Sequence, residues 1–319
     1  MKIQHLAMGL LLLAACANPE EKDIVDNPFY KEYDTPYGVP PFEEIKDEHY
    51  LPAFKDGMKQ QLKEVDAIAN NDEDPTFENT IVAYEKSGEL LSKVANVFYT
   101  LTGADTNDSI QAIQKEVSPL LSAHNDNIYL NEAFYKRVKT LYENQESLGL
   151  TGEQAKLLEN YQNRFVRSGA ALNLEQKTRM REINERVSNL QVQFSENLLK
   201  ETNNFELLLD EDQLDGLPES VRTAGAEAAK ERGYDGKYLF TPHRPSLYPF
   251  ITYSTNRDLR EQLKKGYIMR GDNGDELDNK EALREIVNHR LEKANLLGFE
   301  THADYALQDR MLNSSDKVY

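Results

Sequence analysis

Apolar residues recur at helical spacing over much of the chain. The most regular series begins near Asn173 and steps by three or four residues over about five turns: Met180, Ile183, Val187, Leu190, Phe194 and Leu198. This series predicts one long amphipathic helix whose apolar stripe is buried, since it would otherwise expose a continuous apolar seam to water. A second series opens at Pro75-Thr76 and predicts a helix that ends near Gly103.

The spacing changes after residue 204. Three short segments are rich in aromatic or branched residues and bounded by Gly, Pro and Asp, which predicts a small antiparallel sheet from 205–209, 237–241 and 248–254. Pro218 and Gly233 are typical of the first turn and the end of a helix, so a helix over 218–232 separates the first two strands. Helices are predicted again over 256–269, 279–297 and 302–312, and residues 313–316 resemble the cap of a further helix. The predicted fold class is mainly α.

The first residues predict export and lipidation. A basic start at Lys2 leads into the apolar run 6–13 and then into Leu13-Ala14-Ala15-Cys16, which matches a lipobox. We therefore expect signal processing at Cys16, lipidation of its thiol and a location at the cell envelope. The alternatives are an ordinary cleaved signal or a disordered start. The apolar run is shorter than the roughly 18 residues that a membrane-spanning helix requires.

These patterns predict four regions. They are a signal peptide (1–16), a tether or extended arm (17–41), an N-terminal helical domain (42–204) and a sheet-containing start of a second lobe (205–319). Cys16 is the single cysteine, so no internal disulfide can form and stability must come from the apolar core.

The charge of the chain limits the classes of molecule that it can bind. The formal net charge is −18 and the isoelectric point is near 4.9. Such a surface repels phosphate backbones, which argues against nucleic acid as a partner.

The histidines do not form a zinc motif. A His-Glu-x-x-His helix places two imidazoles on one face and a glutamate beside the bound water, but no histidine here is followed by glutamate. His289 and His302 lie on neighbouring predicted helices without a third clustered ligand. His124 fits a capping role or a buried hydrogen bond better than catalysis, and His243 lies in a turn that permits a substrate contact without requiring one.

The sequence also lacks the motifs of calcium sites, phosphate-binding loops and serine nucleophiles. The acidic segment 210–216 has Leu214 at a calcium-ligand position and a displaced glycine, and segment 272–278 is better interpreted as an acidic loop. No phosphate-binding glycine loop or Gly-x-Ser-x-Gly elbow is present. No residue of this chain is therefore assigned to catalysis or to metal binding, and substrate-binding residues are unknown.

Several stretches together resemble the thimet oligopeptidase, oligopeptidase A and peptidyl-dipeptidase family of zinc metallopeptidases, nearest the bacterial peptidyl-dipeptidase branch. The motifs include Asn27-Pro28-Phe29 and Pro75-Thr76-Phe77-Glu78-Asn79-Thr80-Ile81. The remaining matching stretches, in the family's order, are 40–54, 67–71, 165–170, 217–220 and 294–300.

The resemblance implies a large helical protein with a deep channel that admits short peptides and a small sheet beside it. It also implies one zinc ion held by His-Glu-x-x-His and a later glutamate, with water on the zinc attacking the peptide and release of C-terminal dipeptides. The zinc half lies beyond Tyr319 in the family's order, so no catalytic or metal residue carries over. The chain is then expected to be an inactive N-terminal portion without zinc, whose partners are short peptides, the missing C-terminal half and, through the lipid, a membrane.

A second hypothesis belongs to a different class. The chain could be a non-catalytic helical lipoprotein that serves as a peptide-binding or scaffold module. A reading frame that continues into a zinc motif would favour the enzyme, and a cooperatively melting product with no metal requirement would favour the scaffold.

Overall fold

The computed structural model describes residues 27–318. The predicted signal peptide and its Cys16 lie outside the described residues. The described residues are mainly helical, as predicted, with one small antiparallel sheet. They group into two compact units, one of residues 27–61 and 88–105 and the other of residues 62–87 and 106–318.

The smaller unit has an aromatic core. It contains the 3-10 turns Pro28–Tyr30 and Pro36–Gly38, most of helix α1 (Asp47–Ala69) and helix α3 (Glu89–Ala104). The ring of Tyr50 lies 5.3 Å from that of Phe29 and 5.1 Å from that of Phe98. Asn27 accepts a hydrogen bond from the Phe29 amide and donates one to the His49 carbonyl. The residues around the Asn27-Pro28-Phe29 motif are therefore a packed part of this unit.

The larger unit contains the remaining elements. It begins with the last turns of α1, residues 62–69, followed by a π-helical turn (Phe77–Val82) and the short helix α2 (Ala83–Glu85). The longer helices that follow are α4 (Asp108–Tyr129), α5 (Glu132–Glu143), α6 (Gly152–Ser168), α7 (Leu174–Asn204), α8 (Glu219–Glu231), α9 (Arg244–Tyr253), α10 (Arg257–Ile268), α11 (Lys280–Leu296) and α12 (His302–Leu307). Single 3-10 turns lie at Gln145–Ser147, Glu211–Gln213 and Ser315–Lys317.

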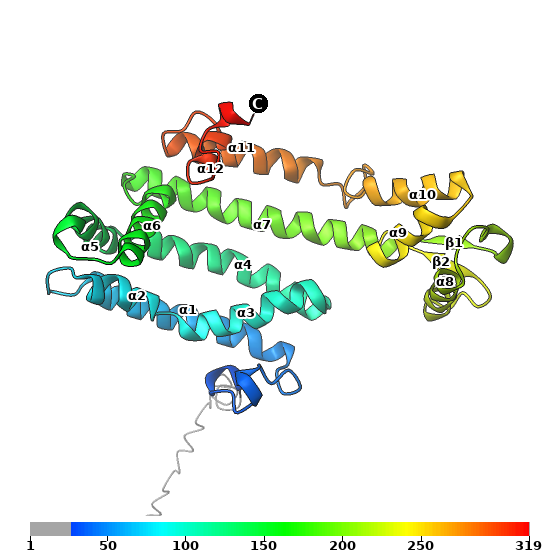
Figure 1. Cartoon of the computed structure of the whole chain (residues 1–319), viewed down its shortest axis with the longest axis horizontal. Helices are drawn as coiled ribbons and strands as arrows, with labels where there is room; N and C mark the ends of the chain where they lie inside the picture. Colours follow the sequence, from blue (N-terminus) through cyan, green and yellow to red (C-terminus); the bar gives the residue numbers. More distant parts are fainter. Residues whose placement is uncertain (1–26, 319) are drawn as a thin grey trace, which may run out of the picture. The chain divides into compact units, whose positions relative to one another are not determined.

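Helix α7 is the central element of this unit. Asn173 caps it, because its side chain accepts from the Gln176 amide while the Gln176 side chain accepts from the Asn173 amide. Met180, Ile183 and Leu190 are buried along it, as the spacing predicted. Helices α4 and α11 both pack against α7 (Figure 1). The long amphipathic helix is thus confirmed.

The sheet has two strands in the described residues. Strand β1 (Leu207–Leu209) pairs antiparallel with β2 (Tyr238–Phe240), and α8 separates them in the chain, as predicted. The predicted third strand over 248–254 is wrong, because these residues belong mostly to helix α9. Pro245 lies in the first turn of α9, and Leu247 and Phe250, three residues apart, are both buried. The Phe250 ring packs 4.5 Å from that of Phe240, so a helical face covers the strand.

Two further predictions need correction. The continuous helix from 75 to 103 is interrupted before α3, because α2 ends at Glu85 and Gly88, the N-cap of α3, adopts φ 72°, a left-handed conformation that a continuous α-helix does not contain. The helix expected over 302–312 ends at Leu307, and Ser315–Lys317 forms one 3-10 turn. Ser315 donates its hydroxyl to Asp304 at 2.5 Å instead of capping a longer helix.

No helix among residues 27–318 has both the length and the apolar character that crossing a membrane requires.

Candidate functional site

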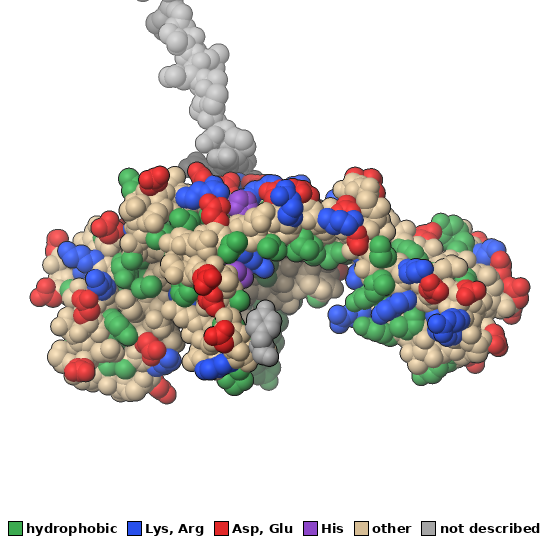
Figure 2. All heavy atoms as spheres, turned by 90° about the horizontal axis from the view of Figure 1, so that it is seen from above, with side chains coloured by type: hydrophobic (Ala, Val, Ile, Leu, Met, Phe, Trp, Pro, Cys, Tyr) green, Lys and Arg blue, Asp and Glu red, His purple; other side chains and the backbone are tan. Residues whose placement is uncertain are grey.

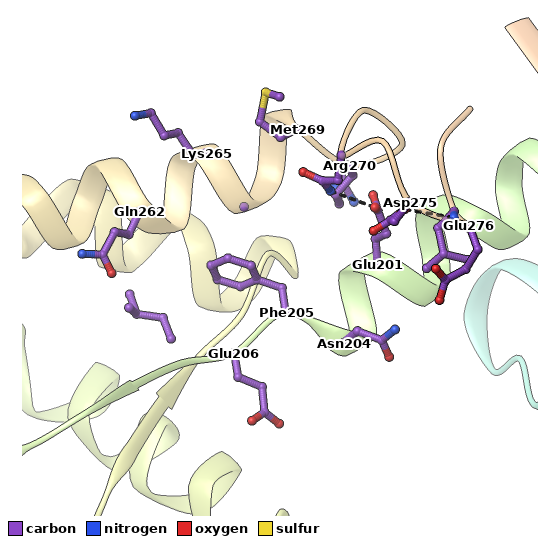
Figure 3. A pocket seen from close by; sticks show the side chains of 14 residues that line it. Glu201, Asn204, Phe205, Glu206, Gln262, Lys265, Met269, Arg270, Asp275 and Glu276 are labelled. Atoms are coloured by element: carbon purple, nitrogen blue, oxygen red, sulfur yellow. Dashed lines mark hydrogen bonds between the residues drawn. The ribbon is translucent and has the colours of Figure 1, made fainter. Parts of the chain in front are cut away.

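A cavity of about 620 Å³ lies beside the C-terminal end of α7, strand β1, α10 and the loop from α10 to α11 (Figure 3). It combines apolar and charged side chains. The residues that line it are Glu201, Asn204, Phe205, Glu206, Leu207, Gln262, Lys265, Gly266, Met269, Arg270, Asn273, Asp275, Glu276 and Leu277.

Glu201 holds the loop against the end of α7. Its carboxylate is buried, and it accepts hydrogen bonds from the Gly271 amide and from the Asn273 side chain, the latter at 2.8 Å. A buried carboxylate requires such partners because removing a charge from water is costly. Figure 3 shows this side chain turned toward the loop. Glu201 therefore positions one wall of the cavity.

Arg270 forms a second link between the loop and α7. Its Nη1 donates to the Thr202 hydroxyl at 2.6 Å, and its Nε donates to the Tyr267 carbonyl at 2.8 Å. The guanidinium also lies 4.2 Å from the centre of the Tyr267 ring, a cation–π distance. With two donors engaged, Arg270 is fixed in place beside the cavity.

Asn279 closes the loop at its far end. Its side chain donates to the Phe194 carbonyl and accepts from Asn197, both at 3.0 Å, and its amide donates to the Gly271 carbonyl at 2.8 Å. Asn197 and Asn279 are buried. Together with Glu201 and Thr202, they make a polar network that joins residues 270–279 to α7.

One wall depends on a close approach of α10. A Cβ atom at Gly266 would lie 2.3 Å from Cε2 of Phe205, so only glycine fits with the ring in this position. The Phe205 ring thereby packs against the α10 backbone (Figure 3). The helix is held close to the start of β1.

Charged residues at the cavity are largely paired within the chain. Glu206 accepts hydrogen bonds from Arg232 at 2.7 Å and from Tyr234 at 2.8 Å. Both bonds lower the pKa of the Glu206 carboxyl group, and the bond from Arg232 has the larger effect. Lys265 lies 2.6 Å from Glu261. These groups give the rim mixed charge.

The cavity does not contain a nucleophile paired with a histidine. Its lining includes no serine, threonine, cysteine or histidine, so it offers no nucleophile with an adjacent imidazole. The arrangement can bind and orient a ligand, and two of its carboxylates, Glu201 and Glu206, form hydrogen bonds within the chain.

The described residues do not fit a zinc ion. No group of three His, Cys, Asp or Glu side chains within residues 27–318 is placed to hold a metal. The carboxylates of the two acidic segments form other contacts. Asp210 lies 2.5 Å from Lys237, and Lys280 pairs with both Asp272 and Asp278.

The structure places the predicted histidines apart from this cavity's lining. His124 is buried on α4, and burial lowers its pKa. His243 shares a 2.9 Å hydrogen bond with the Thr241 hydroxyl, and burial lowers its pKa as well. His289 lies 3.7 Å from Glu292, and within residues 27–318 no third ligand joins it and His302.

The polar network behind the cavity was not predicted from the sequence. A signal was present, because Asn197 and Glu201, three and seven residues after Phe194, continue the spacing of the buried α7 stripe with polar residues. A polar residue at a core position implies a buried partner. The partners themselves, on residues 270–279, could not be identified from α7 alone.

Comparison with known proteins gives consistent matches. The model of peptidase family M3 matches residues 250–319, which include α10, α11 and part of the cavity. The chain is 35% identical over 291 residues to the dipeptidyl carboxypeptidase of Escherichia coli, covering 91% of this chain and 43% of that protein. It is 31% identical to the oligopeptidase A of Haemophilus influenzae, and the match covers 88% of this chain and 42% of that protein. The chain thus spans less than half the length of the curated relatives it matches.

Proposed function

Because this chain belongs to peptidase family M3, we propose that it is the N-terminal portion of a peptidyl-dipeptidase, a zinc metallopeptidase that releases dipeptides from the C-termini of short oligopeptides. The observation that carries this proposal is the 35% identity to a dipeptidyl carboxypeptidase over 91% of the chain. Oligopeptidases A match at lower identity, which supports the peptidyl-dipeptidase branch.

In this proposal the chain has a structural role in the enzyme and contributes no catalytic residue. Its sequence contains no His-Glu-x-x-His motif, and its described side chains do not fit zinc. The helices around α7 would form part of the wall of a peptide channel. Rigid helical walls select short peptides by size, which contributes to specificity without contributing to bond cleavage.

We also propose that the protein is exported and anchored at the cell envelope through a lipid on Cys16. The lipobox Leu13-Ala14-Ala15-Cys16 supports this proposal. Growth with a labelled fatty acid should label the wild-type protein and leave Cys16→Ser unlabelled. Equal labelling of both proteins would refute the anchor.

The catalytic assignment is tested with two proteins. The purified 319-residue chain, given zinc and a short peptide with a free C-terminus, should release no dipeptide. The product of the whole reading frame should contain the zinc motif, release dipeptides and lose this activity to a chelator. Chelator-sensitive hydrolysis by the 319-residue chain alone would overturn the proposal, as would a reading frame without the motif.

A second candidate function is a non-catalytic peptide-binding or scaffold lipoprotein. The cavity beside α7 favours it, because a hollow of this size accommodates a small polar ligand without any metal. This alternative predicts a monomeric product that melts cooperatively and binds little hydrophobic dye. Strong dye binding or aggregation would instead support a chain that lacks a partner lobe.

A further inference from the structure

Helix α11 carries apolar side chains on two faces. Ala282, Ile286 and Ala294 are buried, and Ile286 packs in a cluster with Leu190 of α7. Leu283, Val287 and Leu291 follow one another at a spacing of four residues on another face and are 51%, 56% and 43% exposed. A surface helix normally buries its one apolar stripe, so apolar residues that continue around the helix beyond its buried side indicate a second contact surface.

We call Leu283, Val287 and Leu291 the α11 stripe. It extends over roughly 12 Å of the helix, since eight residues rise by 1.5 Å each. Figure 2, which turns the view of Figure 1 by 90° so that it is seen from above, shows hydrophobic side chains in a row at the surface. A shallow hollow of about 440 Å³ adjoins the stripe at Leu291 and is also lined by Asn288, Asn295 and Leu296.

The charged residues next to the stripe already have partners within the chain. Arg284 donates to Glu281 at 2.9 Å, Arg186 of α7 donates to Glu285 at 2.8 Å, and Arg179 of α7 donates to Glu292 at 2.6 Å. Few free charges therefore border the stripe. It matches an apolar partner surface better than a charged one, because a charged partner would lose hydration without gaining a new ion pair.

We propose that the α11 stripe is the face on which the remainder of the full-length peptidase packs. This inference rests on the proposed function. The relatives are more than twice as long as the stretch they share with this chain, so more than half of such a protein is available to cover the stripe. Helix α11 also lies inside residues 250–319, the stretch that matches the family model. A permanent apolar contact of this kind is typical of parts that fold together.

The test measures how fast a thiol on the stripe reacts with a maleimide. Cys16→Ser removes the single thiol of the 319 residues, and Val287→Cys then adds one on the stripe. The control is Lys139→Cys on α5, whose lysine side chain is 51% exposed and lies on a helix without such a stripe. Both variants are made in the 319-residue chain and in the product of the whole reading frame. Peptide mass mapping locates the label, and dipeptide release is measured in parallel.

We expect Val287→Cys to react at least about tenfold more slowly in the whole protein than in the 319-residue chain, with Lys139→Cys within about twofold, because thiol reactivity follows exposure. Equal rates for Val287→Cys in both proteins, with peptide hydrolysis intact, would overturn this inference alone. Protection of Val287→Cys without hydrolysis would overturn the proposed function and leave the stripe assignment standing. Slow labelling in the 319-residue chain together with a doubled mass in solution would identify a second copy as the occupant and refute the proposed one.

Discussion

Gly271 is the residue on which the loop between α10 and α11 depends. It adopts φ 74°, its amide donates to the buried Glu201, and its carbonyl accepts from the Asn279 amide. A Cβ atom there would lie 2.9 Å from Nδ2 of Asn279. Backbone conformation and lack of space therefore both require glycine at this position.

Replacing Gly271 tests this account. Gly271→Ala should lower the free energy of unfolding by about 2–3 kcal/mol, since the left-handed conformation costs an alanine about 1–2 kcal/mol and Asn279 must also move. Gly274→Ala is the matched control, because φ is 73° but no atom lies within 4 Å of its added Cβ. Gly274→Ala should lower the free energy of unfolding only by the cost of the left-handed backbone conformation. Urea denaturation measures both, and equal losses would show that the contact with Asn279 is unimportant.

At the level of elements, the seam between α7 and α11 combines a small apolar contact with two ion pairs. Ile286 packs in a cluster with Leu190, while Arg179–Glu292 and Arg186–Glu285 lie at the rim, where all four side chains are partly exposed. Apolar burial is worth more than an exposed ion pair, because water screens the charges and both long side chains lose freedom. The ion pairs mainly set how the two helices align.

This ranking predicts unequal losses. Ile286→Ala should lower the free energy of unfolding by about 2–4 kcal/mol. Arg186→Met keeps the apolar part of the side chain, removes the ion pair and should cost less than about 1 kcal/mol. Thermal or urea melts followed by circular dichroism compare the two variants. A larger loss for Arg186→Met would mean that the ion pair, rather than packing, holds α11 in place.

The region around α9 shows what local pattern could and could not predict. Residues 205–209 and 237–241 were expected as strands, and β1 and β2 form within them. Residues 248–254 have a similar composition but are mostly helical, because α9 begins at Arg244 and directs Leu247 and Phe250 into the same cluster as Phe240. Composition alone did not distinguish a strand from a short helix that covers one.

At the scale of the whole molecule, the described residues divide into two units, and the smaller one draws on two separate segments of chain. The boundary predicted between residues 204 and 205 remains a prediction. Several histidines in the larger unit are shifted in the same direction: burial lowers the pKa of His124, His243 and His302. These shifts link the stability of the unit to pH.

The sign of this linkage follows from the direction of the shifts. A histidine whose pKa is lower in the folded state binds a proton less tightly there than in the unfolded state. Its contribution to the free energy of unfolding is therefore complete above about pH 6.5 and is lost as the pH falls through the folded pKa. His124→Gln removes one such group. The stability lost between pH 7.5 and pH 5 should therefore be smaller in His124→Gln than in the wild type, as measured by urea midpoints. An identical decline in both proteins would show that the pKa of His124 does not differ between the folded and unfolded states.

The sequence by itself determined the helical class, the start of α7 at Asn173, the positions of β1 and β2 and the family motifs, because caps and apolar periodicity are local properties. Only the tertiary structure decided the interruption at Gly88, the helical state of 248–253, the polar network between α7 and residues 270–279, and the exposure of the α11 stripe. Each of these depends on partners distant in sequence or on a backbone angle that neighbouring residue types do not specify. The cavity belongs to this second group, since its walls come from segments that meet only in the folded chain.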